Sequence, residues 1–301
     1  MTAIALVGTG ALASLFGARL SDAGCEVILL GTWREGLESL RQDGVCLVEG
    51  TQEHVYPVQA VSDPADIQGL TLARFLVKSW QTKRAAAQLA EFLPRAGLAV
   101  TLQNGLGNKA ALCRQLGDER VAQGVTTTGA TLLGPGRVRP GGEGVISLEA
   151  HPRLGPMAEL LQSAGFKVQI SPDLDGLVWK KLIINAAINP LTALLEVPNG
   201  NLLESPSACR IMSRASQEVW DLADALGIEV GTMDPTTAPA QVARKTASNL
   251  SSMYQDIQRG APTEINAICG EVVRLGGECG IPTPTNECLS LAVKAKVELA
   301  G

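Results

Sequence analysis

The stretch from Trp179 to Thr192 contains residues whose types and spacing could support proton transfer. Lys181, Asn185 and Asn189 recur every four residues in an otherwise apolar segment, so on a helix their side chains share one stripe. A lysine in apolar surroundings loses its proton more readily, which makes it a usable general acid near neutral pH. A bound anionic substrate with a carbonyl group would satisfy all three polar groups. The alternative is that Lys180 and Lys181 form a solvated pair near a helix start, because lysines usually extend their charge to water.

A strand, a tight turn and a helix at the start of the chain would position a dinucleotide. The apolar run Ile4–Val7 is followed at once by Gly8-Thr9-Gly10-Ala11-Leu12-Ala13, a G-x-G-x-x-A motif. Gly8 permits the turn, Gly10 lets the backbone approach a pyrophosphate, and the small Ala13 lets helix and strand pack closely. We therefore assign Gly8, Thr9, Gly10, Ala11 and Leu12 to cofactor binding.

The end of the next expected strand, Glu26–Leu30, indicates which dinucleotide is bound. An NAD site would place a carboxylate there to hold the ribose 2′-hydroxyl, but the chain reads Gly31-Thr32-Trp33-Arg34. The guanidinium of Arg34 offers a fork of donors that fits a 2′-phosphate. We predict NADPH as the cofactor. The alternative, an ordinary loop arginine, stays open because Glu35 and Glu38 lie nearby.

Polar residues also follow two later strands. The run Phe75–Val77 leads into Lys78, and Leu98–Leu102 leads into Gln103 and Asn104. Ligands of open α/β sheets bind at the carboxyl ends of the strands. Lys78 and Asn104 are therefore expected where nicotinamide and substrate meet, although either could be a loop residue, since Asn-Gly is common in turns.

The order of elements predicts two domains. From Val121 to Leu148 short β-like segments, separated by glycine-rich turns, are expected to complete the sheet, followed by a helix and a strand ending at Ile170. From Asp173 onward helical segments dominate, broken at prolines that include Pro190. We predict an α/β fold in which a Rossmann-type doubly wound NADPH-binding domain, residues 1–170, precedes an all-helical substrate and catalytic domain, residues 171–301. A cleft between two such domains is a usual place for a small-molecule site.

Composition excludes several classes of partner. The net charge is −5 and the basic residues are dispersed, so we expect no nucleic acid partner. The apolar runs are too short for a membrane span, and the N-terminus lacks the features of a signal peptide, which predicts a cytoplasmic protein. The seven cysteines form no C-x-x-C pair and are expected to be reduced. His54 and His151 are not in metal-ligand spacing, so no metal is expected.

Motifs spread over nearly the whole chain together resemble those of the ketopantoate reductase (2-dehydropantoate 2-reductase) family. Their order and spacing match jointly, which is more specific than the glycine turn alone. The motifs are Gly8-Thr9-Gly10-Ala11, Val77-Lys78-Ser79-Trp80-Gln81-Thr82, Gln103-Asn104-Gly105, Trp179-Lys180-Lys181-Leu182 through Asn185, Asn189-Pro190-Leu191-Thr192, Pro198-Asn199-Gly200, Ser251–Asp256 and Thr263-Glu264-Ile265. The resemblance implies a Rossmann domain followed by a helical domain, NADPH as cofactor, and pantoate as a product for pantothenate and coenzyme A synthesis.

The resemblance also implies roles for individual residues. Lys181 would protonate the ketone oxygen as hydride arrives, and Glu264 would position the lysine and the substrate hydroxyl. The residues implied in substrate binding are Asn104, Asn185, Asn189, Asn199 and Ser252. The residues implied in cofactor contact, beyond the glycine turn, are Arg34, Lys78, Asn104 and Glu264.

Two alternatives remain open at this stage. The chain could reduce a different branched 2-keto acid, because the motifs mostly serve the shared keto-acid chemistry. It could also be a protein that senses NADPH without turnover, although a sensor has no need of a proton donor. The chain could also form a homodimer.

Overall fold

The computed structural model describes residues 3–67, 72–75 and 78–300. The chain divides into two compact units: unit 1 comprises Met1–Gln103 and Asn108–Leu174, and unit 2 comprises Asn104–Gly107 and Asp175–Gly301. Leu76 and Val77, which we expected at a strand end, lie outside the described residues. The chain therefore leaves unit 1 for four residues after Gln103, returns, and leaves again after Leu174.

Unit 1 is built on a sheet that contains eight strands among the described residues. Their order is β12-β11-β8-β7-β6-β1-β2-β5, and neighbours are parallel except β8 and β11. The strands are β1 (Ala3–Val7), β2 (Glu26–Leu30), β5 (Gln59–Val61), β6 (Leu72–Phe75), β7 (Leu98–Thr101), β8 (Val121–Thr126), β11 (Val145–Glu149) and β12 (Lys167–Ser171). The strand order reverses between β1 and β6, and ligands of such sheets bind outside the carboxyl ends of the strands at that point.

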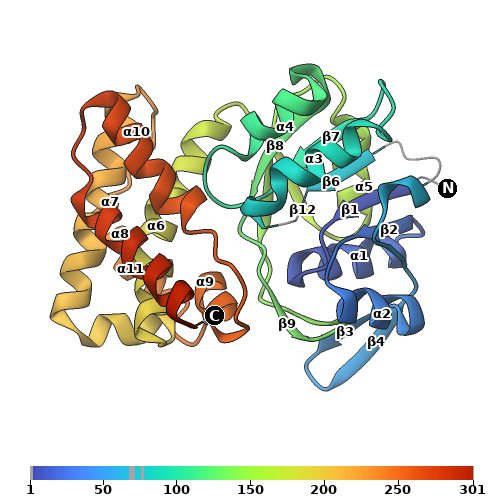
Figure 1. Cartoon of the computed structure of the whole chain (residues 1–301), viewed down its shortest axis with the longest axis horizontal. Coiled ribbons are helices and arrows are strands. Elements are labelled where there is room, and N and C mark those ends of the chain that lie inside the picture. Colours follow the sequence, from blue (N-terminus) through green and yellow to red (C-terminus); the bar gives the residue numbers. More distant parts are fainter. Residues whose placement is uncertain (1–2, 68–71, 76–77, 301) are drawn as a thin grey trace. The chain divides into compact units, whose positions relative to one another are not determined.

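Helices cover both faces of this sheet (Figure 1). Alternate residues of β1 point to opposite faces: Ile4 and Leu6 join a core with α1 and α5, whereas Ala5 and Val7 join a core with α3 and α4. The helices of unit 1 are α1 (Ala11–Asp22), α2 (Arg34–Asp43), η1 (Pro64–Asp66), η2 (Ser79–Gln81), α3 (Thr82–Ala90), α4 (Asn108–Leu116), η3 (Asp118–Arg120) and α5 (Gly155–Ser163). The expected doubly wound Rossmann-type architecture is confirmed.

A second, four-stranded sheet among the described residues of unit 1 corrects one expectation. Its order is β4-β3-β10-β9, with bounds Val45–Glu49 for β3, Gln52–Tyr56 for β4, Ala130–Gly134 for β9 and Arg137–Pro140 for β10. We expected all the segments between Val121 and Leu148 to complete the main sheet, which is wrong for β9 and β10. Strand β10 instead pairs with β3, so that Val138 and Leu47 are opposite each other and both are buried in the core that α1 covers.

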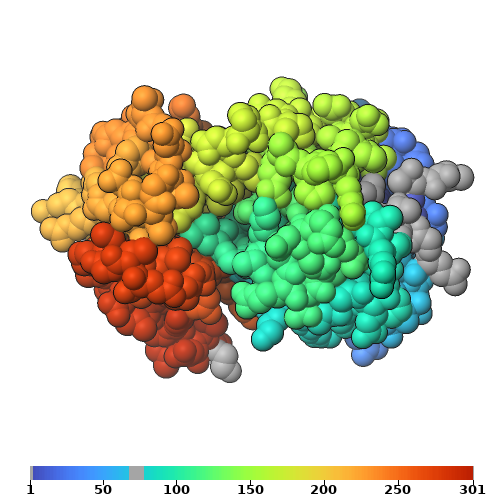
Figure 2. All heavy atoms as spheres, turned by 90° about the horizontal axis from the view of Figure 1, so that it is seen from above, coloured from blue at the N-terminus to red at the C-terminus, as the bar shows by residue number. Residues whose placement is uncertain are grey.

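Unit 2 is helical and is organised around its longest helix, α6 (Leu174–Leu195). The other helices are η4 (Asn199–Glu204), α7 (Pro206–Ala225), α8 (Ala238–Lys245), α9 (Ser252–Gln258), the π-helical turn η5 (Asn266–Gly270), α10 (Glu271–Cys279) and α11 (Pro284–Ala300). Helix α6 contributes buried residues such as Ile183 and Ala187 to one core cluster. Figure 2 shows the red chain of α10 and α11 at the surface of this unit, beside the orange chain that follows α6. No helix within the described ranges is long and apolar enough to cross a membrane.

Helix α6 continues through Pro190, where we expected a break. Proline has no N–H, so the carbonyl of Ala186, four residues earlier, loses its usual helical partner. The thiol of Cys269 in η5 donates to this carbonyl with Sγ and O 3.9 Å apart. Both residues are completely buried. A donor from another element thus partly replaces the helical hydrogen bond that the proline removes, and the helix continues through Pro190. At Pro206 and Pro284, by contrast, new helices begin.

Candidate active site

Helix α6 presents the predicted stripe of polar side chains. Because the helix is continuous over Leu174–Leu195, Lys181, Asn185 and Asn189 follow one another along the same face. Asn189 is buried, and Lys181 and Asn185 are half-buried. Within the described part of the chain, the side chains of Asn185 and Asn189 make no hydrogen bond, which suits groups that bind a ligand.

The electrostatic environment of Lys181 suits a proton donor. Burial lowers the pKa of Lys181 to about 8, and the negative charge of Glu264 acts in the opposite direction by favouring the ammonium form. The lysine is therefore still protonated at neutral pH but gives up its proton more readily than an exposed lysine. A general acid of this strength is well matched to a ketone oxygen that becomes basic during reduction.

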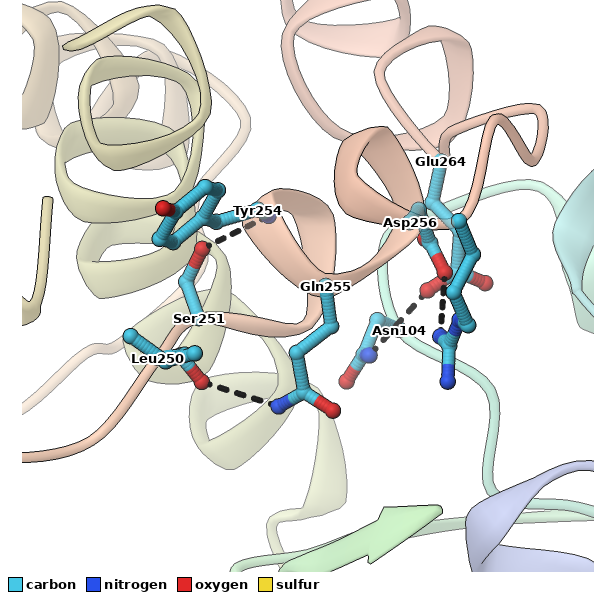
Figure 3. A network of polar contacts seen from close by, with 8 residues as sticks. Asn104, Leu250, Ser251, Tyr254, Gln255, Asp256 and Glu264 are labelled. Carbon is cyan, nitrogen blue, oxygen red and sulfur yellow. Dashed lines mark hydrogen bonds and ion pairs between the residues drawn. The ribbon is translucent and has the colours of Figure 1, made fainter. Parts of the chain in front are cut away.

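Glu264 and Asn104 are brought together from distant parts of the sequence. The Glu264 side chain is almost fully buried, with 5% of its surface exposed. Nδ2 of Asn104 donates to Oε2 of Glu264 at 3.2 Å (Figure 3). Asn104 follows β7 but belongs to unit 2 together with Glu264 and Lys181. Three of the predicted residues thus form one polar group in the helical unit.

The segment around Ser252 shows a residue that the sequence analysis missed. Ser251, not Ser252, caps α9: its Oγ accepts a hydrogen bond from the backbone N of Tyr254 at 3.1 Å (Figure 3). The same Oγ accepts from Oγ1 of Thr192 on α6 at 2.7 Å. Ser252 follows as the first residue of α9 and is half-buried. A serine directly before a helix is a typical cap, and this pattern could have assigned Ser251 a structural role.

Asn199 lies in η4, and its contacts are structural. Its Nδ2 donates to Oγ1 of Thr246 at 2.9 Å, and its backbone N donates to the carbonyl of Asn249 at 3.0 Å. Among the described residues, no contact of Asn199 with Lys181 or Glu264 is observed. Its contact with substrate stays a prediction.

The glycine turn of unit 1 fits the pyrophosphate of a dinucleotide. Gly8 has a φ of 134°, which favours glycine, and its N donates to the carbonyl of Leu30 at 2.7 Å. Gly10 caps α1 without a side-chain hydrogen bond, and a Cβ at Gly10 would project into open space. The first N–H groups of α1, which include those of Ala11 and Leu12, have no partner inside the helix. An anion can therefore approach the backbone here.

The other predicted cofactor residues lie at the ends of strands or at helix starts. Thr9 is buried against Gly31, where a Cβ would lie 2.8 Å from Oγ1 of Thr9. Arg34 is the first residue of α2; its side chain is 88% exposed, and its Nε lies 2.9 Å from Oε1 of Glu38. Lys78 precedes η2 and is half-buried. Most N–H donors of the Arg34 guanidinium thus face solvent, where a phosphate group of a ligand can approach them.

A polar network that the sequence analysis did not identify lies at the end of β7. Nε2 of Gln103 donates to Oγ1 of Thr82 at 2.5 Å, and Oγ1 of Thr82 donates to Oδ1 of Asn108 at 3.0 Å. Oγ1 of Thr101 donates to Oε1 of Gln103 at 2.9 Å. These bonds connect β7 to the first residues of α3 and α4. The network therefore fixes both ends of the segment that contains Asn104.

The fold, a Rossmann-type domain followed by a helical domain, is that of a class of two-domain oxidoreductases. Two family models match the chain: "Ketopantoate reductase PanE/ApbA" over residues 4–153 and "Ketopantoate reductase PanE/ApbA C terminal" over residues 173–297. The chain belongs to the ketopantoate reductase family.

Individual relatives agree with this membership. A 2-dehydropantoate 2-reductase of Halobacterium salinarum is 35% identical over 298 residues, covering 97% of each chain, and one of Archaeoglobus fulgidus is 35% identical over 293 residues, covering 95% of each. The structure of a PanE/ApbA family ketopantoate reductase from Ralstonia eutropha is similar with a TM-score of 0.91 at 32% identity, covering 99% of both chains. A D-mandelate dehydrogenase has a TM-score of 0.92 at 24% identity over 99% of both chains, which shows a shared fold.

Proposed function

We propose that this protein catalyses the NADPH-dependent reduction of 2-dehydropantoate to pantoate. The observation that carries the proposal is the half-buried lysine Lys181, whose pKa is lowered to about 8, in the field of Glu264. Relatives at 35% identity over nearly the whole chain are named for this reaction. A ketone reductase needs a proton donor at this kind of site, whereas a nucleotide sensor does not.

The residues of unit 2 would act on the substrate. When bound, the reduced nicotinamide supplies the hydride that adds to the ketone carbon. The ammonium of Lys181 donates its proton to the ketone oxygen and stabilises the negative charge that develops there. Glu264 favours the ammonium form of Lys181 and is held by Asn104. Asn185, Asn189 and Ser252 would provide hydrogen bonds to the carboxylate and hydroxyl groups of the substrate, with Asn199 as a further predicted contact.

The residues of unit 1 would hold the dinucleotide. The backbone from Gly8 to Leu12 would receive the pyrophosphate at the start of α1. Arg34 would pair with the 2′-phosphate, because no carboxylate occupies the end of β2 to hold a free 2′-hydroxyl. Lys78 and Asn104 would contact the nicotinamide side of the cofactor.

The direct test is the oxidation of NADPH followed by absorbance. Purified protein is assayed with 2-dehydropantoate and with a panel of other branched 2-keto acids, each with NADPH and with NADH. We expect 2-dehydropantoate with NADPH to give the highest kcat/KM. A higher kcat/KM for another 2-keto acid would make that acid the substrate in place of 2-dehydropantoate. Tight NADPH binding without turnover of any keto acid would contradict an enzymatic function and favour a role in sensing NADPH.

A cytoplasmic location and a homodimer complete the proposal. All seven cysteines are free thiols, which supports a reducing compartment.

Light scattering during size-exclusion chromatography tests the oligomeric state, and a mass of one chain would exclude the dimer.

A further inference from the structure

The turn η5 makes contacts on two sides with elements that contain candidate catalytic residues. In this turn the N of Gly270 donates to the carbonyl of Ile265 at 2.9 Å, five residues earlier, which is the wide spacing of a π-helix. Single π-turns inside helical segments are frequent at functional sites. Glu264 lies two residues before this turn, and its carbonyl accepts from the N of Ala267 at 3.0 Å. The backbone of the candidate catalytic glutamate is therefore fixed to η5.

The first contact of η5 holds the loop Asn104–Gly107. The carbonyl of Ala267 accepts a hydrogen bond from the N of Leu106 at 2.8 Å. The side chain of Leu106 packs against the core of the helical unit. Asn104 is thereby placed where its amide reaches the carboxylate of Glu264. One carbonyl of η5 thus anchors the loop that supplies the hydrogen-bond partner of Glu264.

Gly105 is the residue that permits this docking. It has a φ of 78°, and a Cβ at this position would overlap the carbonyl oxygen of Ala267. That oxygen is the acceptor of the Leu106 hydrogen bond, so a side chain at Gly105 and the hydrogen bond exclude each other. Gly107 has a similar φ of 81°, but the nearest atom to a Cβ there is Cδ of Glu271 at 3.7 Å. The two glycines therefore share their backbone conformation and differ in whether a side chain would clash.

The second contact of η5 reaches α6, the helix of Lys181. The thiol of Cys269 donates to the carbonyl of Ala186, which Pro190 leaves without its usual helical partner. Ala186 directly follows Asn185. Burial raises the pKa of the Cys269 thiol above its ordinary value, so the sulfur keeps the proton that it donates. The contact ties η5 to the polar stripe of α6.

We propose that η5 is a positioning element that fixes the spacing between Asn104, Glu264 and Lys181, and that Gly105 and Cys269 are positioning residues for the reaction. The inference rests on the proposed function for the roles of Lys181 and Glu264. Neither Gly105 nor Cys269 touches substrate in this scheme. Each acts by holding an element that contains a catalytic residue.

The sharpest test compares Gly105→Ala with Gly107→Ala. Both substitutions strain the backbone, because both glycines have a positive φ, but only Gly105→Ala breaks the contact with Ala267. We expect Gly105→Ala to lower kcat roughly tenfold to a hundredfold, as for a misplaced catalytic group, with a smaller change in the KM for NADPH, because Asn104 is only one of the predicted cofactor contacts. The alkaline limb of its pH profile should move to lower pH, because a displaced Glu264 raises the pKa of Lys181 less. Gly107→Ala should lose thermal stability alone.

The Cys269 contact is tested by Cys269→Ala and Cys269→Ser, with the exposed Cys279→Ser as control. Serine keeps a donor to the Ala186 carbonyl, whereas alanine removes it. We expect kcat to fall in Cys269→Ala and to be largely restored in Cys269→Ser. Equal kcat values in both variants and in the control would remove Cys269 from the proposal.

Hydrogen exchange of the Leu106 amide separates this inference from the proposed function, because it requires no turnover. The amide should be protected in the unchanged protein and in Gly107→Ala, and should exchange at least tenfold faster in Gly105→Ala. If the unchanged protein reduces no keto acid, the proposed function fails, and the exchange rates still report whether η5 holds the loop. If the protein is active and the two glycine variants have the same exchange rate and the same kcat, the positioning role is overturned.

Discussion

Asn104 and Glu264 are 160 positions apart in the sequence, yet Nδ2 of Asn104 lies 3.2 Å from Oε2 of Glu264. The Glu264 carboxylate is buried, and a buried carboxylate requires hydrogen-bond donors. The amide of Asn104 is one such donor, and it comes from the segment Asn104–Gly107, which follows strand β7 of unit 1 after two residues. The same glutamate acts electrostatically on Lys181.

Replacing Lys181 by methionine removes the ammonium while keeping an unbranched side chain. We expect kcat to fall by roughly two to four orders of magnitude, the range for losing a general acid, with little change in the affinity for NADPH. Steady-state kinetics and fluorescence titration of NADPH measure the two effects. A variant with near-normal kcat would exclude Lys181 from the reaction.

The rate of ketone reduction should depend on the protonation of Lys181. The ammonium is the active form, so kcat should decline as the pH rises through about 8, the pKa of Lys181. In Glu264→Gln the charge that raises this pKa is lost, and the decline should begin at lower pH. Profiles of kcat against pH for both proteins test the shift. A shift to higher pH would mean that Glu264 does not favour the ammonium form.

Arg34 should determine the preference for NADPH over NADH. In Arg34→Ala we expect the KM for NADPH to rise roughly tenfold, because a charge-assisted hydrogen bond to phosphate is lost, and the KM for NADH to stay constant. The exposed Arg114→Ala on α4 is the matched control for the loss of one positive charge. If both variants change the KM for NADPH equally, Arg34 affects NADPH binding only through the net charge of the protein.

Glu218 on α7 should stabilise the start of α11. Its carboxylate accepts hydrogen bonds from the backbone N of Thr285 at 2.7 Å, the backbone N of Asn286 at 2.9 Å and Nδ2 of Asn286 at 2.8 Å. In Glu218→Gln one acceptor becomes a donor, and we expect the free energy of unfolding to fall by about 1–3 kcal/mol. Urea denaturation measures the change, with Gln217→Ala on the same helix as control.

Features that depend on short-range patterns could be predicted from the sequence. Strand β1, the glycine turn and α1 follow from an apolar run, Gly8, Gly10 and a helical period within the first 22 residues. The stripe of Lys181, Asn185 and Asn189 follows from helical spacing alone. Both arguments use residues that are neighbours in the chain, where local geometry dictates which side chains share a face.

Features that depend on distant partners could not be predicted. Strands β9 and β10 join the smaller sheet because β10 pairs with β3, about ninety residues earlier. Helix α6 passes Pro190 with a donor from Cys269, 83 positions beyond the acceptor Ala186. The network of Gln103, Thr82 and Asn108 likewise joins the starts of two helices to a strand end. In each case the deciding contact becomes apparent only in the folded chain.

The cysteines of the protein should differ in reactivity according to their burial, and Cys269 is buried. Burial raises the pKa values of Cys25, Cys46 and Cys113, the last to about 11, so these sulfurs contain little thiolate. Cys279 and Cys288 are exposed and should react first with maleimides or iodoacetamide. A fluorophore or spin label can therefore be attached to the C-terminal helices of the natural sequence while the sulfur that supports α6 stays unmodified.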